Sequence, residues 1–184
     1  MVKQGLFVAL LAAVAVLASA QETQPPLPVE PTGIIETLPA RYPADWFFVH
    51  DAAFFHMSDG KVYLLDTDKD SIGDQVKGLF PVSLMGAFIE APSRGEIFAV
   101  ETFHTRGTRG DRIDVLTIWD TVNLAAIAEV MLPTGKRFMG MPERGALQLL
   151  KNDRWPAIFN FSPSKTVTPV DLDTRAVIGA IPNT

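Results

Sequence analysis

Arginine is the residue type whose spacing in this sequence points most directly to chemistry. Residues 102–120 run Thr-Phe-His-Thr-Arg-Gly-Thr-Arg-Gly-Asp-Arg-Ile-Asp-Val-Leu-Thr-Ile-Trp-Asp, so Arg106, Arg109 and Arg112 lie in a glycine-bearing loop that leads into an alternating strand. Planar guanidinium groups form paired hydrogen bonds with carboxylates and phosphates. The loop could therefore bind a phosphate or a nucleic acid, act as the adhesion tripeptide Arg109-Gly110-Asp111, or pair with carboxylates of this chain or of a protein partner.

The overall charge helps to choose among these interpretations. The chain has 16 lysines and arginines against 21 aspartates and glutamates, a formal net charge of −5. A nucleic-acid binder needs a basic surface to displace counterions, so we predict no nucleic-acid partner. Because the adhesion tripeptide is common by chance, we favour a loop in which Arg106, Arg109 and Arg112 are paired internally or face a protein partner.

The other titratable residues give little support to a catalytic or metal site. His50 and His56 are six residues apart on one expected strand, about 20 Å when fully extended, which is too far to share one metal ion. Glu90 and Glu101 lie in apolar strand contexts, where burial could make a carboxylate a base; we favour ion pairs with the nearby arginines instead. No nucleophile elbow, phosphate loop or dinucleotide fingerprint is present. We predict no catalytic, cofactor-binding or metal-binding residue in this chain.

The N-terminal residues suggest an exported protein. Lys3, an apolar run over residues 5–17 and Ala18-Ser19-Ala20 have the order of a cleaved secretory signal. The apolar run is shorter than the roughly 20 residues that a membrane-spanning helix needs, so we expect no anchor after cleavage. Residues 21–40 are rich in proline and predict a disordered lead-in, and we place the folded part at 41–184. Since the chain has no cysteine, its stability must come from an apolar core.

A repeat of about fifty residues predicts the fold. Alternating segments end at Asp66, Asp120 and Asp171, which are 54 and 51 residues apart, and each is followed by a second short apolar run. We assign these aspartates to turns, where their carboxylates accept backbone N–H groups. A second repeat places a Pro-x-x-Gly turn at 92–95 and at 142–145, each followed by a strand.

The repeat points to antiparallel, four-stranded β-propeller blades. A β-sandwich is the competing all-β fold, but it does not require two interleaved repeats of constant length. No helical period appears after residue 21. The length accommodates about three blades, whereas closed propellers have about four to eight, so we expect a partial propeller from a truncated chain.

The arginine loop also carries a family resemblance. The pattern Thr-x-x-x-Arg-x-x-Arg-Gly-x-Arg-x-Asp over residues 102–114, the preceding strand at 96–101 and the segment Phe-Asn-Phe-Ser-Pro at 159–163 resemble the heavy chains of the tryptophylquinone amine dehydrogenases, covering about residue 46 to the end. The sequence of this region is more similar to the aromatic amine branch of the family than to the methylamine branch. The resemblance implies a seven-bladed propeller, of which this chain is the N-terminal portion.

The resemblance also implies a division of labour between two polypeptides. Two heavy chains pair with two small, disulfide-rich light chains, and the light chain carries both tryptophan tryptophylquinone and the catalytic base. The complex deaminates primary amines oxidatively to aldehydes and ammonia in the periplasm and passes electrons to a copper protein or a cytochrome. We therefore interpret Trp46, Trp119 and Trp155 as blade residues.

The heavy chain of this family also lines the substrate channel. Alignment on the segment 76–78 places Leu84 at a channel position that is aromatic in methylamine members, with Phe103 a weaker candidate. An apolar residue smaller than an aromatic one would widen the channel, so we predict an aromatic amine preference. Leu84 could equally be an ordinary blade residue, and the competing function is an exported propeller scaffold or binding protein without a redox role.

Overall fold

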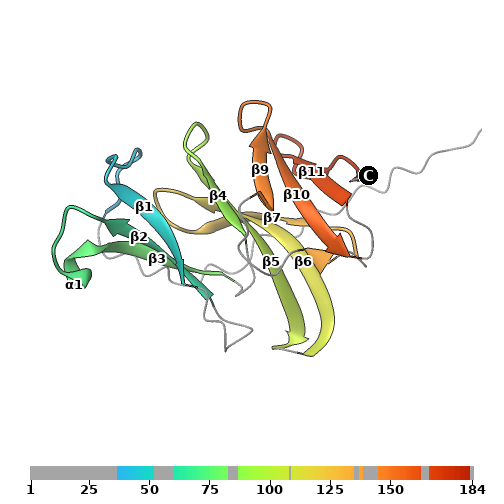
Figure 1. Ribbon diagram of the computed structural model, residues 1–184, viewed down its shortest axis with the longest axis horizontal. Coiled ribbons are helices and arrows are strands. Elements are labelled where there is room, and N and C mark those ends of the chain that lie inside the picture. The colour runs from blue at the N-terminus through green and yellow to red at the C-terminus, as the bar shows by residue number, and fades with distance from the viewer. Residues whose placement is uncertain are drawn as a thin grey trace, which may run out of the picture.

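Strands make up nearly all of the regular structure in this chain. The computed structural model describes residues 37–51, 60–82, 87–107, 109–134, 137–138, 145–162 and 166–182 (Figure 1). These residues form three antiparallel sheets, which stand side by side in chain order. The all-β prediction of a partial propeller with about three blades is confirmed. None of the helical structure in the described ranges is long and apolar enough to cross a lipid bilayer.

The first sheet has three strands in the order β1-β2-β3, which are β1 (Trp46–Asp51), β2 (Gly60–Asp66) and β3 (Val76–Val82). One helical turn, α1 (Ile72–Gln75), precedes β3. Ser71 caps it by accepting a hydrogen bond from the Asp74 amide at 3.2 Å. The sequence has no helical period after residue 21, and a helix of four residues is too short to produce one.

The second sheet is the four-stranded blade that the repeat predicts. Its strands lie in the order β4 (Phe88–Ala91), β5 (Glu96–Arg106), β6 (Arg109–Asp120) and β7 (Ala126–Met131). The turn at 92–95 joins β4 to β5, and in it the Arg94 amide donates to the Ala91 carbonyl at 3.0 Å. Gly95 has a φ of 64°, a conformation that favours glycine. The first Pro-x-x-Gly motif is thus a tight turn.

The third sheet uses six short strands in place of four longer ones. The strands β8 (Arg137–Phe138) and β9 (Leu147–Leu150) pair with different parts of β10 (Trp155–Ser162). On the other side of β10 lies β11 (Thr166–Asp171), which pairs with β12 (Ala176–Val177) and β13 (Ile181–Pro182). Strand alternation predicts the blade but does not predict the break between β12 and β13 at residues 178–180.

Two apolar cores hold the three sheets together, and β5 contributes to both. Ile97 and Ala99 point from one face of β5 into a first core with the first sheet, and Phe98 and Val100 point from the other face into a second core with the third sheet. The first core comprises Leu38, Val62, Leu64, Phe80, Val82, Ile97, Ala99, Trp119 and Leu124. Because neighbouring side chains of a strand point to opposite faces, an apolar run without polar alternation suits a strand buried on both faces.

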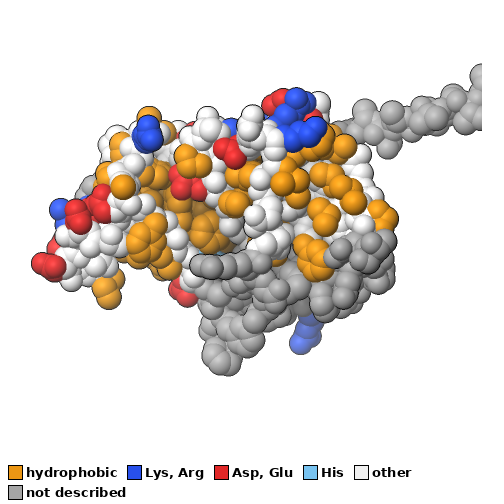
Figure 2. Space-filling view, turned by 45° about the horizontal axis from the view of Figure 1, so that its top comes forward, with side chains coloured by type: hydrophobic (Ala, Val, Ile, Leu, Met, Phe, Trp, Pro, Cys, Tyr) orange, Lys and Arg blue, Asp and Glu red, His pale blue; other side chains and the backbone are white. Residues whose placement is uncertain are grey.

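The surface differs along the molecule. Figure 2 shows hydrophobic side chains spread over one face, with acidic side chains gathered at the end that carries α1. Large apolar side chains remain exposed on all three sheets, among them Phe47, Phe103, Leu150 and Ile181.

The three repeat aspartates end equivalent strands and share one kind of contact. Asp66 ends β2 and its carboxylate accepts the Asp68 amide at 3.1 Å. Asp120 ends β6 and accepts the amides of the two residues 122 and 123 at 2.9 and 2.7 Å. Asp171 ends β11 and accepts the amide of residue 173 at 2.9 Å. Such contacts stabilise a turn by satisfying backbone donors that have no strand partner.

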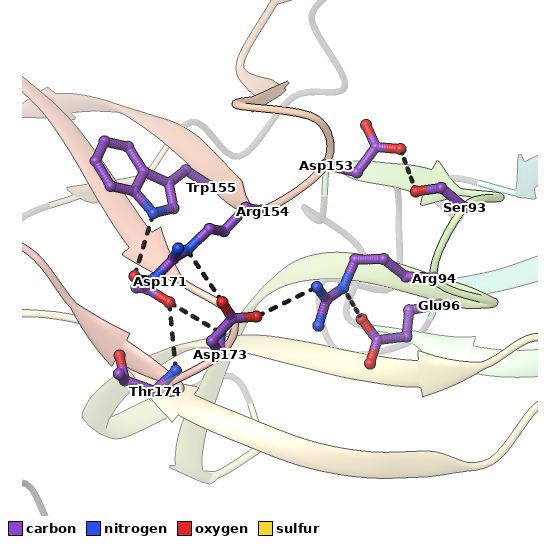
Figure 3. A network of polar contacts seen from close by, with 9 residues as sticks. All are labelled: Ser93, Arg94, Glu96, Asp153, Arg154, Trp155, Asp171, Asp173 and Thr174. Atoms are coloured by element: carbon purple, nitrogen blue, oxygen red, sulfur yellow. Dashed lines mark hydrogen bonds and ion pairs between the residues drawn. The ribbon is translucent and has the colours of Figure 1, made fainter.

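Charged side chains on the turns connect the second sheet to the third (Figure 3). Arg94 lies 2.6 Å from Glu96 within the second sheet and 3.6 Å from Asp173 of the third. Arg154 binds both Asp173, at 3.1 Å, and Asp171, at 2.9 Å. The polar network therefore crosses the gap between two sheets at the end of the molecule that carries the repeat aspartates.

Candidate functional site: the hairpin of β5 and β6

The arginine loop is the tip of a hairpin that is longer than its neighbours. Strands β5 and β6 pair with each other from Glu96 to Arg106, whereas β4 pairs with β5 only up to Ala99 and β7 pairs with β6 only from Val115. Among the described residues, the outer part of the hairpin therefore projects as a two-stranded arm. It lies at the end of the sheets opposite to the repeat aspartates.

The glycines give the arm its turn. Arg106 pairs with Arg109, which leaves two residues in the loop, and Gly107 has a φ of 71°. Gly110 has a φ of 95° and lies beside a register shift, where a β-carbon would come within 2.2 Å of the Thr105 hydroxyl oxygen. That hydroxyl accepts the Asp111 amide at 3.1 Å. The glycine spacing of the motif is thus a requirement of the backbone.

One arginine of the motif is paired within the arm. The Arg112 guanidinium donates through Nε and Nη2 to the carboxylate of Asp114 at 2.8–3.0 Å, and through Nη2 to the Thr102 hydroxyl at 3.2 Å. Asp114 is buried. Arg112 therefore fixes the base of the arm. The sequence interpretation missed Asp114, although the two-residue spacing from Arg112 puts both side chains on one face of the strand.

The other two arginines are exposed at the tip. Arg106 and Arg109 lie directly opposite each other across the two strands. Neither has an ion pair or a side-chain hydrogen bond to any residue that the structure describes. Like charges at opposed positions are unfavourable for the hairpin. The pair is therefore suited to an anionic group from outside the described chain.

The expectation that Glu90 and Glu101 pair with these arginines is wrong. Glu101 lies on β5 opposite Val115, on the other face of the hairpin from Arg112, so strand alternation keeps the two side chains apart. Glu101 is buried and accepts a hydrogen bond from the Thr117 hydroxyl. Glu90 makes no ion pair with a described residue, and burial raises the pKa of its carboxyl.

Of the two channel candidates, the structure describes Phe103 but not Leu84. Phe103 is 41% exposed and lies opposite Ile113, which is 37% exposed, so the arm carries an apolar pair on one face. Leu84 lies outside the described residues. Val82, which ends β3, and Ala87, which directly precedes β4, lie at the same end of the sheets as the arm.

The histidines and tryptophans are spread over the fold. His50 lies on β1 with its ring 5.9 Å from Phe88, and burial lowers the pKa of its imidazole; His56 lies outside the described residues. Within the described ranges, no three histidine, aspartate or glutamate side chains gather as a metal site. Trp46, Trp119 and Trp155 belong to three different sheets. Trp46 and Trp119 both pack against the first core, which agrees with their interpretation as blade residues.

Comparison with known proteins shows which protein family this chain resembles. The family model described as methylamine dehydrogenase heavy chain (MADH) matches residues 43–182. The chain is 32% identical over 133 residues to a methylamine dehydrogenase heavy chain of Methylophilus methylotrophus and 27% identical over 132 residues to one of Methylobacillus flagellatus. Each alignment covers 71% of this chain, which spans 31% of the length of each relative.

Proposed function

The chain belongs to the methylamine dehydrogenase heavy chain family, and on this premise we propose that it acts in the noncatalytic heavy subunit of a quinoprotein amine dehydrogenase. The complex would deaminate primary amines oxidatively to aldehydes and ammonia. The family match over residues 43–182 is the observation that carries the proposal.

The quinone would belong to a partner light chain. When bound in the complex, tryptophan tryptophylquinone would supply the oxidising chemistry, with electrons leaving to a periplasmic copper protein or cytochrome. The match to the heavy chain family supports a cofactor from another polypeptide. The residues of this chain would position the light chain and line the route of the amine.

The arm of β5 and β6 is the surface that we assign to the light chain. It combines an apolar pair, Phe103 and Ile113, with the two exposed arginines at its tip. Interfaces commonly join an apolar contact to charged groups that set orientation, and arginine is enriched in them. The carboxylates that would meet Arg106 and Arg109 belong to the partner.

Amine preference and export belong to the same proposal. We assign Leu84 and Phe103 to the substrate channel and an aromatic amine as the substrate, because a smaller side chain at position 84 leaves more room than an aromatic one. We assign residues 1–20 to a signal peptide that directs the chain to the periplasm. Sequencing the N-terminus of the exported product would test this cleavage, with Gln21 expected as the first residue.

Coexpression with a small cysteine-rich light chain tests the central proposal. The light chain is expected to copurify with this chain and to bring visible absorbance and amine-dependent dye reduction. If a folded light chain fails to bind, the heavy-subunit assignment is wrong and the chain is an exported propeller scaffold.

A further inference from the structure

A cavity of about 520 Å³ lies at the end of the molecule opposite to the arm. It is formed between the segment that precedes β1 and the turn ends of the second sheet. Two aromatic side chains, Tyr42 and Trp46, and one carboxylate, Glu90, line it. Arg41, Ser93 and Thr121 also line it, so its wall is mixed polar and apolar, and its volume is typical of a small-molecule site.

Glu90 is an exception to the packing pattern of its strand. It lies opposite Ile97, so its side chain points to the same side of the sheet as the first core. Phe88, two residues earlier, packs against that core. Glu90 is half-buried, yet it has no ion pair or hydrogen bond with a described residue. A carboxylate at such a position is costly unless a cation or a donor meets it.

The aromatic walls are held in place by contacts of their own. The rings of Tyr42 and Trp46 stack with centroids 6.0 Å apart and 29° between their planes. The Tyr42 hydroxyl donates to the Thr121 carbonyl. Burial and the nearby charge of Glu90 raise the pKa of the Tyr42 phenol. The phenol therefore stays neutral, and the negative charge that acts on it comes from Glu90 and, to a smaller extent, from Asp120.

The indole ring of Trp46 already contacts one cation within the protein. The Lys77 ammonium lies 5.7 Å from the centre of the Trp46 ring, within the range of a cation–π contact. Lys77 also lies 3.7 Å from the buried carboxylate of Asp66. Arg41 lines the cavity as an exposed side chain and forms no ion pair with a described residue. Because neither Lys77 nor Arg41 pairs with Glu90, the Glu90 carboxylate is available to an added cation.

We propose that this cavity binds a small organic ammonium ion, whose charge meets the Glu90 carboxylate and whose hydrocarbon part packs on Tyr42 and Trp46. The Glu90 carboxylate would repel an anion, and it would give a metal ion a single carboxylate ligand. An ammonium ion with an apolar body matches both features of the cavity, because carboxylates and aromatic faces each attract cations.

This site is separate from the one assigned to the light chain. The cavity lies at the turns of β4 and β6, whereas Phe103 and the tip arginines lie at the opposite ends of the strands. Ammonium binding therefore does not require the partner or the quinone, and it can be measured on this chain alone. A failure to bind the light chain would leave the proposal standing.

Calorimetric titration with benzylammonium chloride tests the proposal at neutral pH and low salt. Benzyl alcohol serves as a neutral ligand of similar shape. We expect the wild-type chain to bind benzylammonium at least about tenfold more tightly than benzyl alcohol, and Glu90→Gln to remove most of that difference. Glu129→Gln is the matched control, because Glu129 is another half-buried glutamate with a pKa raised by burial but does not line the cavity.

Two further measurements separate binding from folding. The urea midpoint of Glu90→Gln should match that of Glu129→Gln, and benzylammonium should shift the amide NMR signals of Gly95 and Thr121 in the wild-type chain. Equal affinities for benzylammonium and benzyl alcohol would overturn the proposal. So would equal losses in the two glutamine variants, signal shifts confined to other regions, or no binding by the wild-type chain.

Discussion

Arg94 of the second sheet lies 3.6 Å from Asp173 of the third, measured between Nη1 and Oδ1. The contact joins two turns that are far apart in the sequence (Figure 3). Both side chains remain partly exposed, with 27% of Arg94 and 53% of Asp173 accessible to solvent. Solvent therefore screens the pair, and its effect on stability is small even though it links two sheets.

Replacing Arg94 by Gln should lower the free energy of unfolding by less than about 1 kcal/mol, because the pair with Asp173 and the contact with Glu96 are both partly exposed. Urea denaturation at low salt measures the change, and the difference from wild type should shrink in about 1 M salt. Arg109→Gln is the control, since Arg109 has no described ion pair. A salt-independent loss would mean that the arginine acts through packing.

The acid stability of the chain should depend on Asp171. The hydrogen bond from Arg154 is the main cause that lowers the pKa of the Asp171 carboxyl to about 2, with help from backbone amides and the Trp155 indole. A carboxyl whose pKa is lowered by folding stabilises the protein above its ordinary pKa, and this stabilisation is lost as the pH falls from about 4 to about 2.

Asp171→Asn should remove that part of the pH dependence. Urea midpoints between pH 6 and pH 2 would measure it, with the variant expected to show a flatter acid limb. Asp120→Asn removes a turn aspartate of the neighbouring sheet but leaves Asp171 in place, so its acid limb should remain steep. Identical limbs in both variants would contradict the assignment.

The first core should be sensitive to the loss of Phe80. This side chain is fully buried and its ring centre lies 4.6 Å from that of Trp119 across the two sheets. Phe80→Ala should cost about 3–5 kcal/mol, because it removes buried apolar area and leaves a cavity. Phe47→Ala is the matched control, since Phe47 is 48% exposed and should cost much less. Equal costs in urea unfolding would mean that the two sheets do not share this core.

Charge reversal at the arm should weaken light-chain binding. The double variant of Arg106→Glu and Arg109→Glu should lower the association rate about tenfold or more, because steering depends on opposite charges. A second double variant, Lys69→Glu with Arg175→Glu, makes the same change in net charge at exposed positions of the opposite end. Surface plasmon resonance would compare the two. Equal effects would show that only net charge matters.

The preference of the assembled complex between amine substrates should depend on the size of the side chain at position 84. In an assembled complex, Leu84→Phe should reduce activity on phenylethylamine relative to methylamine, because a bulkier side chain narrows the proposed channel. Measuring both amines on one preparation cancels differences in the active fraction. An unchanged ratio would remove Leu84 from the channel.

Features with a local cause could be predicted from the sequence. Alternation over a few residues and the turn chemistry of Asp66, Asp120 and Asp171 indicate strands and their ends, because both depend on neighbours in the chain. The spacing of these aspartates then indicates three repeated sheets. The break between β12 and β13, at residues 178–180, leaves no comparable signal.

Contacts between distant segments required the tertiary structure. The sequence places three arginines near Glu101, but the faces of the strand decide that Arg112 binds Asp114 and that Glu101 meets Thr117. The sequence likewise shows Glu90 only as a carboxylate in an apolar strand. Its position beside Tyr42 depends on how the segment before β1 packs against another sheet. Side-chain direction within a strand is set locally, whereas the partner that a side chain meets is set by the packing of sheets, which sequence spacing alone does not determine.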